Sequence, residues 1–354
     1  VLGVYMQMNK IFHYLFKIRI LTTKLHSLEK CYLTWKTECE NRFLKMKDNE
    51  EHINVVILKE YGLENEVSCE VPEKSISVHR IFDTKEDIPV SMDGSYYVRT
   101  KRDEIVSLIS YSVGCMFGRY SLDKKGIVNA GAPLNVNEYV SFSVDKDNII
   151  PICDDEYFKD DIVGRFVEFI KIVYGADSLD DNLTFIAKAL GGKGSPREII
   201  RNYFVNDFYK EHCATYSGTV GKRPIYWLFD AGKNNSFKAL IYMHRYQPDT
   251  IARIRTDYVH EQQARYRTAI ADLEQRIANT STGERVKLKK KLATLQAQDT
   301  EIRTYEEKIH HLADQMISIN LDDGVKKNYA LFHILSINNL NCFCLTRSLS
   351  VTMA

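Results

Sequence analysis

The chain has 354 residues, a length that allows two domains or one large domain with an appendage. Hydrophobic residues make up 44% and charged residues 27%, which is ordinary for a protein with a packed core and excludes wholesale disorder. The formal net charge of +1 excludes strong attraction to nucleic acid through bulk charge, so any DNA contact requires a local basic face or a partner domain.

The first sixty residues carry a helical pattern. Apolar residues such as Tyr5, Met8 and Phe12 recur at three- and four-residue spacing, and this periodicity predicts helix over 4–60. Gly62 follows the last apolar residues, and a glycine in that place is typical of a helix C-terminus.

The next part of the chain mixes short extended pieces, a helix and a long loop. Residues 76–78 and 96–98 are β-rich and lie near prolines and an Asp-Gly turn, which predicts two short strands or extended pieces. A single apolar face over 105–116 predicts a helix. Residues 123–148 are rich in Gly, Pro and Asn and predict a loop, with a possible strand at 139–144.

Three further helices are predicted before residue 224. The first shares one apolar face over 162–173 and ends at Gly175, and the second covers 182–190. Ser195 and Pro196 have the residue types of an N-cap and a first helical position, so a third helix is predicted to begin there.

A β-hairpin is predicted from two strand-like runs. Residues 224–229 and 237–243 are rich in aromatic and aliphatic residues, and the polar segment 230–235 lies between them as a turn.

A long helical hairpin is predicted after Pro248. Its second arm carries apolar residues seven positions apart: Leu288, Leu295, Ile302, Ile309 and Met316. The polar segment 279–283 separates the two arms.

The fold class is therefore predicted as α+β, predominantly helical, with a short β-hairpin region and a long antiparallel coiled-coil helical hairpin. We expect a helical connector at 1–62, an α+β domain at 63–247, the coiled-coil hairpin at 248–320 and a C-terminal tail at 321–354.

No catalytic, cofactor or metal site is predicted. A methyltransferase acting on an exocyclic amine needs an Asp/Asn-Pro-Pro-aromatic loop, and all seven prolines here are isolated. The Gly-rich run 191–194 lacks the spacing of a phosphate-binding loop, and the eight cysteines form no Cys-x-x-Cys pair. The acidic residues in 154–161 could hold a divalent cation for a nuclease, but their place before a helix is explained by its dipole.

Candidate DNA contacts lie in the hairpin and near the tip of the coiled coil. Basic and amide side chains there could read base edges or contact phosphates, although a solvated surface is the simpler explanation for any one of them. The candidates are Lys222, Arg223, Lys233, Asn234, Asn235, Lys238, His244, Arg245, Lys289 and Lys290.

Several strings resemble the C-terminal half of BREX-type adenine-specific DNA methyltransferases. They are residues 108–123, 150–156, 160–166, 223–229 and 237–246, in the family's order and spacing. Together with residues 50–63, the resemblance covers roughly residues 35–330. The resemblance implies a bacterial phage-defence protein of the cytoplasm that methylates adenine at N6 with S-adenosylmethionine. It also implies that duplex DNA is a partner, that the domain at 63–247 is a DNA-recognition or scaffold domain, and that the catalytic domain lies upstream.

The chain departs from this family at both ends. It begins mid-pattern with Val1, so we interpret it as part of a longer polypeptide that is inactive alone. The segment 335–354 does not look like the family's ending and is interpreted as aberrant. An alternative function is a protein-interaction module that docks other BREX subunits through the coiled coil. No stretch approaches the length of about 20 apolar residues needed to span a membrane.

Overall fold

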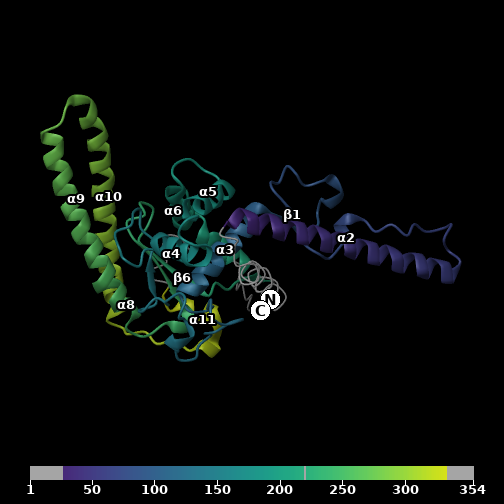
Figure 1. The fold of residues 1–354 in the computed structure, drawn as a ribbon. Coiled ribbons are helices and arrows are strands. Elements are labelled where there is room, and N and C mark those ends of the chain that lie inside the picture. Colours follow the sequence, from purple (N-terminus) through teal and green to yellow (C-terminus); the bar gives the residue numbers. More distant parts are fainter. Residues whose placement is uncertain (1–26, 219–220, 333–354) are drawn as a thin grey trace, which may run out of the picture. The chain divides into compact units, whose positions relative to one another are not determined.

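The computed structural model describes residues 27–218 and 221–332, which divide into two compact units (Figure 1). We call residues 27–112 and 169–199 the helical unit, and residues 113–168 and 200–332 the sheet unit. The first part of the predicted N-terminal helix and the C-terminal tail after residue 332 lie outside the described residues.

The helical unit is built on one long helix. Helix α2 (Leu28–Tyr61) begins after Ser27, whose hydroxyl accepts the backbone N–H of Lys30, and ends at Gly62 with φ +69°. The predicted helix and its glycine stop are confirmed over this range. Trp35 is buried on α2 and donates from its indole N–H to Glu104 at 3.0 Å.

Three further elements complete the helical unit. They are the strands β1 (Arg80–Phe82) and β2 (Val98–Thr100), which pair in parallel, and helix α5 (Leu179–Leu190). No strand forms at 76–78, although Ile76 has the extended backbone that was the alternative there. The backbone turns at Glu73–Ser75, and Ile76 is buried with Phe43 instead of pairing. The second predicted strand lies two residues later than expected.

Three helices contain residues of both units: α3 (Lys101–Met116), α4 (Ile162–Tyr174) and α6 (Pro196–Asn206). All three were predicted. Gly175 follows α4 with φ +94°, and Pro196 is the first residue of α6. Ser195 and Glu198 form a reciprocal capping pair, with hydrogen bonds from each residue's backbone N–H to the other's side chain.

The sheet unit contains a three-stranded antiparallel sheet in the order β3-β7-β6. The strands are β3 (Ile149–Pro151), β6 (Tyr226–Asp230) and β7 (Lys238–Tyr242), and β7 is buried along its whole length. The predicted hairpin is confirmed, with Tyr226 opposite Tyr242 and Asp230 opposite Lys238.

The strand predicted at 139–144 is wrong. A 3₁₀ turn over Val136–Glu138 is followed by bends, and the backbone N–H of Ser141 donates to the carboxylate of Asp123 at 2.9 Å. Side-chain acceptors therefore satisfy a backbone group that a strand partner would otherwise take.

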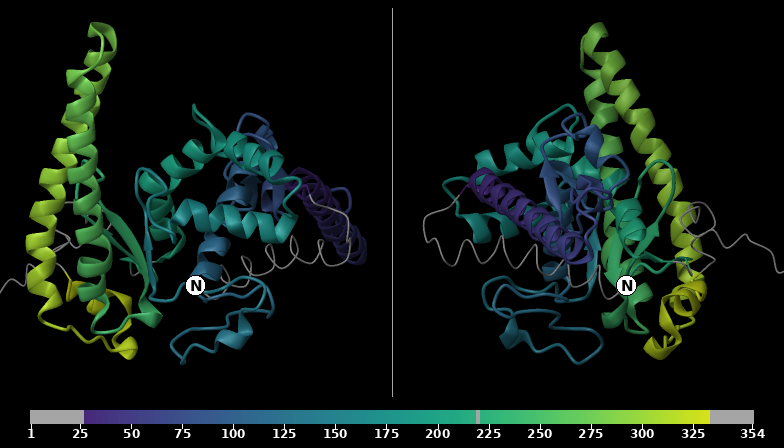
Figure 2. Two further views of the ribbon diagram at one scale, coloured as in Figure 1. Left: turned by 60° about the vertical axis from the view of Figure 1, so that its left-hand side comes forward. Right: turned by 90° about the vertical axis from the view of Figure 1, so that its right-hand side faces the viewer.

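A long helical hairpin extends from the sheet unit, and we call it the arm (Figures 1 and 2). It comprises α8 (Thr250–Arg253), a π-helical turn (Ile254–Val259), α9 (His260–Ala278) and α10 (Thr282–Ala313). The predicted hairpin is confirmed. Its buried seam includes Tyr266, Leu273, Leu295, Ile302 and Ile309.

The heptad prediction is wrong at its last position. Helix α10 ends at Ala313, and Met316 lies beyond it with φ +44° and 50% of its surface exposed. The remaining elements are α7 (Phe208–Thr215), α11 (Gly324–Ala330) and the two-residue strands β4 (Ser217–Gly218) and β5 (Gly221–Lys222). Within the described residues, no helix combines the length and apolar character that crossing a membrane requires.

Candidate nucleic-acid interface

The turn between β6 and β7 is held by the arm. The carboxylate of Glu301 on α10 accepts the backbone N–H groups of Asn234 at 2.9 Å and Ser236 at 3.1 Å. A Cβ atom on Gly232 would lie 2.6 Å from the same carboxylate, so this close approach requires glycine. Gln298, also on α10, donates to the carbonyl of Asn234 at 3.1 Å.

Helix α9 contacts the same turn. The hydroxyl of Tyr266 donates to the carbonyl of Ser236 at 2.8 Å, and both residues are buried. The turn therefore has a fixed backbone, with Asn235 in the left-handed region at φ +53°. Lys233 is exposed, whereas Asn234 and Asn235 are half-buried.

Lys238 is buried, and its contacts give it a structural role. Its side chain is buried, and its ammonium group donates to the carbonyl of Val205 at 2.9 Å and lies 3.5 Å from the carboxylate of Asp230. Burial raises the pKa of Asp230. Because the Lys238 ammonium is already bonded and has little access to solvent, we do not include it in the proposed DNA surface.

The two basic residues before β6 lie at a small hairpin. Lys222 ends β5, and its side chain lies outside the described part of the structure. Arg223 is exposed, and its backbone N–H donates to the carbonyl of Tyr216 at 2.8 Å.

The arm carries a group of exposed lysines near its free end, which we call the arm lysines: Lys287, Lys289, Lys290 and Lys291. None of these four is paired with a carboxylate among the described residues. Lys289 and Lys290 were predicted as DNA contacts. Four unpaired ammonium groups within five residues make this the densest run of lysine in the chain.

The last two candidates, His244 and Arg245, line a pocket at the end of β7. It has a volume of about 490 Å³ and lies within the sheet unit. Arg245 donates to the carbonyls of Phe117, Asp145 and Lys146 at 3.3, 2.9 and 3.3 Å. Burial lowers the pKa of His244 to about 4, so its imidazole is neutral at neutral pH.

The comparisons with known proteins identify relatives of this chain. No family model matches it. Adenine-specific methyltransferase PglX of Lacticaseibacillus casei (strain Zhang) is 40% identical over 309 residues, which are 86% of this chain and 24% of the relative. Adenine-specific methyltransferase BrxX of Escherichia coli O9:H4 (strain HS) is 44% identical over 248 residues, which are 66% of this chain and 20% of the relative.

The chain is a homologue of the BREX adenine-specific methyltransferases. The resemblance stated from the sequence is thereby confirmed. The chain spans about a quarter of the length of the curated relatives that it matches.

In this methyltransferase homologue, the acidic segment before α4 is paired with arginines. Asp161 forms a two-pronged ion pair with Arg201 at 2.8 and 2.9 Å, and it also caps α4 by accepting the N–H of Val163. Asp154 and Asp155 both pair with Arg265. These contacts give the segment a structural role and add no support to the nuclease hypothesis.

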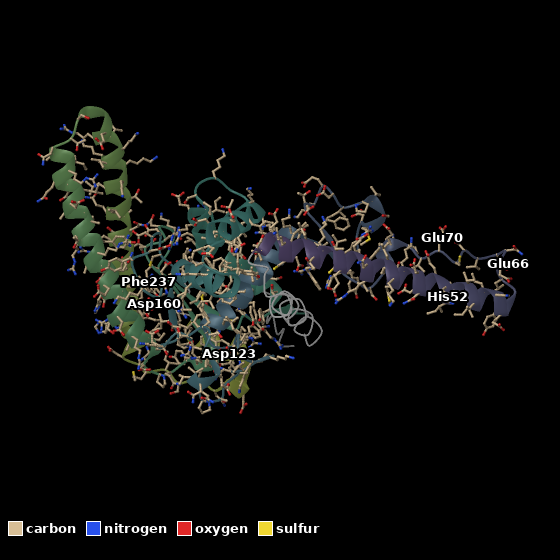
Figure 3. The ribbon with its side chains drawn as sticks, viewed as in Figure 1. His52, Glu66, Glu70, Asp123, Asp160 and Phe237 are labelled. Atoms are coloured by element: carbon tan, nitrogen blue, oxygen red, sulfur yellow. The ribbon has the colours of Figure 1, made fainter. Side chains whose placement is uncertain are left out.

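A second acidic group is made of Asp145, Asp147 and Asp160, each of which can place one carboxylate oxygen within 4.8 Å of the others. The hydroxyl of Tyr258 lies 2.9 Å from Asp147 and 2.5 Å from Asp160, which is labelled in Figure 3. Burial, followed by the charge of Asp147, raises the pKa of Asp145 well above its ordinary range. Hydrogen bonding and a retained proton therefore both reduce repulsion within this group.

Sequence reasoning missed Glu301, which holds the β6–β7 turn, and Lys146, which lines the pocket at the end of β7. Glu301 occupies an ordinary polar position of α10, and Lys146 stands between two aspartates in a loop. Both acquire their roles from contacts across long sequence separations, for which neither periodicity nor a local motif provides a signal.

Proposed function

We propose that this chain is the DNA-recognition and scaffold part of a site-specific N6-adenine DNA methyltransferase of a bacterial BREX phage-defence system. The observation that carries the proposal is its identity of 40–44% with one segment of two adenine-specific methyltransferases. The chain itself contains no Pro-Pro sequence. The base-flipping chemistry, and with it S-adenosylmethionine, is therefore assigned to another part of the enzyme.

The arm lysines are the first proposed contact with duplex DNA. Helix α10 has 32 residues, so it is about 48 Å long at 1.5 Å per residue. Lys287 to Lys291 lie in its second and third turns, near the free end of the arm (Figure 2). Unpaired ammonium groups in this position can reach phosphates without reorganising a packed surface.

The β6–β7 turn is the second proposed contact. Its backbone is fixed by Glu301 and Tyr266, while Lys233 projects as an exposed side chain. A turn fixed from two helices can present a side chain in a constant position, which is what recognition of a groove or a phosphate requires.

The alternative role, docking of other BREX subunits through the arm, needs an apolar surface there. Among the described side chains of α9 and α10, Val286 is the single large hydrophobic residue that is exposed, at 68%. Specific protein interfaces generally have an apolar centre. The arm is thus better suited to a charged partner than to an apolar one.

The test compares duplex-DNA binding by the purified chain and by a variant with Lys287, Lys289, Lys290 and Lys291 all changed to Glu. The proposal predicts that this variant loses at least about tenfold in affinity at low salt. A matched variant with the same four residues changed to Arg keeps the charge and should bind like the wild type. Equal binding by the Glu variant and the wild type would overturn the role of the arm.

A further inference from the structure

The pocket at the end of β7 has walls fixed by hydrogen bonds within the sheet unit. On one side, the amide of Asn129 donates to the carbonyl of Ala132 at 2.7 Å, which closes the loop that carries Gly131. Gly131 has φ +114°, and a Cβ atom there would lie 2.9 Å from Leu321. The hydroxyl of Tyr242 donates to the carbonyl of Asn129 at 2.9 Å and ties this loop to β7.

The pocket lining also contains an arginine without a carboxylate partner among the described residues. The guanidinium of Arg245 donates to three backbone carbonyls, and no ion pair joins it to a carboxylate in the described part of the chain. Asp145 is near, but burial raises the pKa of its carboxyl, which favours the neutral form of that group. A half-buried guanidinium held in this way retains its charge and has N–H groups left to donate.

A second free cation lies at the same pocket. Lys146 is exposed, lines the pocket and has no carboxylate partner among the residues that the structure describes. Two further charged residues of the lining, Arg253 and Asp249, form an ion pair with each other at 2.7 Å, so their charges largely offset one another. Asp147 also lines the pocket, and its carboxylate accepts the backbone N–H of Ile149 at 3.0 Å. The lining cations Lys146, Arg245 and Arg253 still outnumber the lining carboxylates Asp147 and Asp249 by one.

We propose that this pocket binds a phosphate group carried by a nucleotide or by a DNA strand, with Arg245 and Lys146 as its ligands. An arginine fork and a lysine are the side chains that most often bind phosphate in proteins. The volume of about 490 Å³ exceeds what phosphate alone occupies, and it lies within the range of pockets that hold whole small molecules. A nucleoside attached to the phosphate therefore has room.

This inference does not depend on the arm. Phosphate binding at Arg245 and Lys146 can exist whether or not Lys287 to Lys291 contact DNA, and each can be tested without the other. The lining of the pocket includes His244 and Arg245, which the sequence analysis proposed as DNA contacts, and also Lys146.

The experiment titrates inorganic phosphate, deoxyadenosine monophosphate and a short DNA duplex into the purified chain at low salt, and follows the phosphate by ³¹P NMR line broadening. Lys146→Gln should weaken phosphate binding about fivefold, because one charge-assisted hydrogen bond is removed. Lys159→Gln, which removes an exposed lysine that does not line the pocket, should leave it unchanged. Arg245→Lys is a second variant, used with a circular-dichroism check of folding.

The sources of the phosphate are separated by competition. If the duplex displaces inorganic phosphate and Lys146→Gln weakens both, the ligand is a DNA backbone phosphate. If deoxyadenosine monophosphate binds and the duplex does not compete, the ligand is a free nucleotide. The proposal is overturned if phosphate does not bind to the wild type, or if Lys146→Gln binds it as tightly as Lys159→Gln does.

Discussion

The carboxylate of Glu301 holds Ser236 through two hydrogen bonds, from its backbone N–H at 3.1 Å and from its hydroxyl at 2.8 Å. Glu301 lies in the middle of α10 and Ser236 ends the β6–β7 turn, so this contact joins the arm to the sheet. The turn and the arm, which are the two proposed DNA-contacting elements, are thus parts of one hydrogen-bonded assembly within the sheet unit.

Replacing this carboxylate tests that connection. We expect Glu301→Gln to lower the free energy of unfolding by about 2 kcal/mol, because an amide supplies one acceptor oxygen where the carboxylate supplies two. Urea denaturation followed by circular dichroism measures the loss. Glu307→Gln, on the exposed side of α10, is the control and should change stability by less than about 0.5 kcal/mol. Equal effects of the two substitutions would contradict the account.

The ion pair between Asp161 and Arg201 should be essential for stability. Both side chains are nearly buried, with exposures of 2% and 11%, so Asp161→Asn removes the closest carboxylate partner of a guanidinium in the interior. Glu156, at 3.6 Å, is then the remaining carboxylate beside Arg201 among the described residues. The expected loss is about 3 kcal/mol in urea denaturation. Changing Arg201 to Met in the same chain should restore part of this loss, since the poorly compensated guanidinium charge is then removed from the interior. A double variant that is less stable than Asp161→Asn alone would show that the charge is not the cause.

His212 should make the sheet unit sensitive to acid. Its imidazole is fully buried and accepts the backbone N–H of Tyr226 at 3.2 Å, and burial lowers its pKa to about 3. The unfolded chain takes up this proton near pH 6.5, so stability contributed by the neutral residue is complete above that pH and is lost as the pH falls toward 3.

The expected size of this effect is about 1.4 kcal/mol per pH unit between pH 6 and pH 4. His212→Gln keeps a hydrogen-bond acceptor but does not titrate. The difference in unfolding free energy between the wild type and this variant should therefore shrink as the pH falls. Parallel pH profiles for the two proteins would show that His212 is not a buried neutral residue.

Lys233 tests the turn separately from the arm. It is exposed and makes no ion pair among the described residues, so Lys233→Glu should leave stability unchanged within about 0.5 kcal/mol. If the turn contacts phosphate, the same change should weaken duplex binding severalfold at low salt. A fluorescence-anisotropy titration measures this, and Lys159→Glu controls for the loss of positive charge alone. Indistinguishable affinities of the two variants would remove the turn from the DNA surface.

Elements with a strong local signal could be predicted from the sequence. The buried residues Leu295, Ile302 and Ile309 of the arm are spaced seven residues apart. The two β-rich strands of the hairpin are separated by one polar turn. Strand β3 was missed because three residues, Ile149 to Pro151, give no periodicity. Its strand conformation is a consequence of pairing with β7.

The candidate site was harder to predict than the fold. Charge and residue type selected both Lys238 and Lys233 as candidate DNA contacts. The strand register places Lys238 opposite Asp230, and its ammonium group donates a hydrogen bond to the carbonyl of Val205. Sequence alone cannot distinguish such a lysine from an exposed one. The phosphate pocket depends on two segments of the chain, residues 131–148 and residues 244–253, which are about a hundred residues apart in the sequence.

The most direct test of the proposed DNA-recognition role is a salt series of duplex binding by the purified chain, without S-adenosylmethionine. The account predicts that the logarithm of the binding constant falls linearly with the logarithm of salt concentration. Changing the four arm lysines to Glu should reduce the slope by about 1 for every phosphate that these lysines neutralise. No binding by the wild type even at low salt would contradict the account, because DNA recognition would then lie elsewhere in the enzyme.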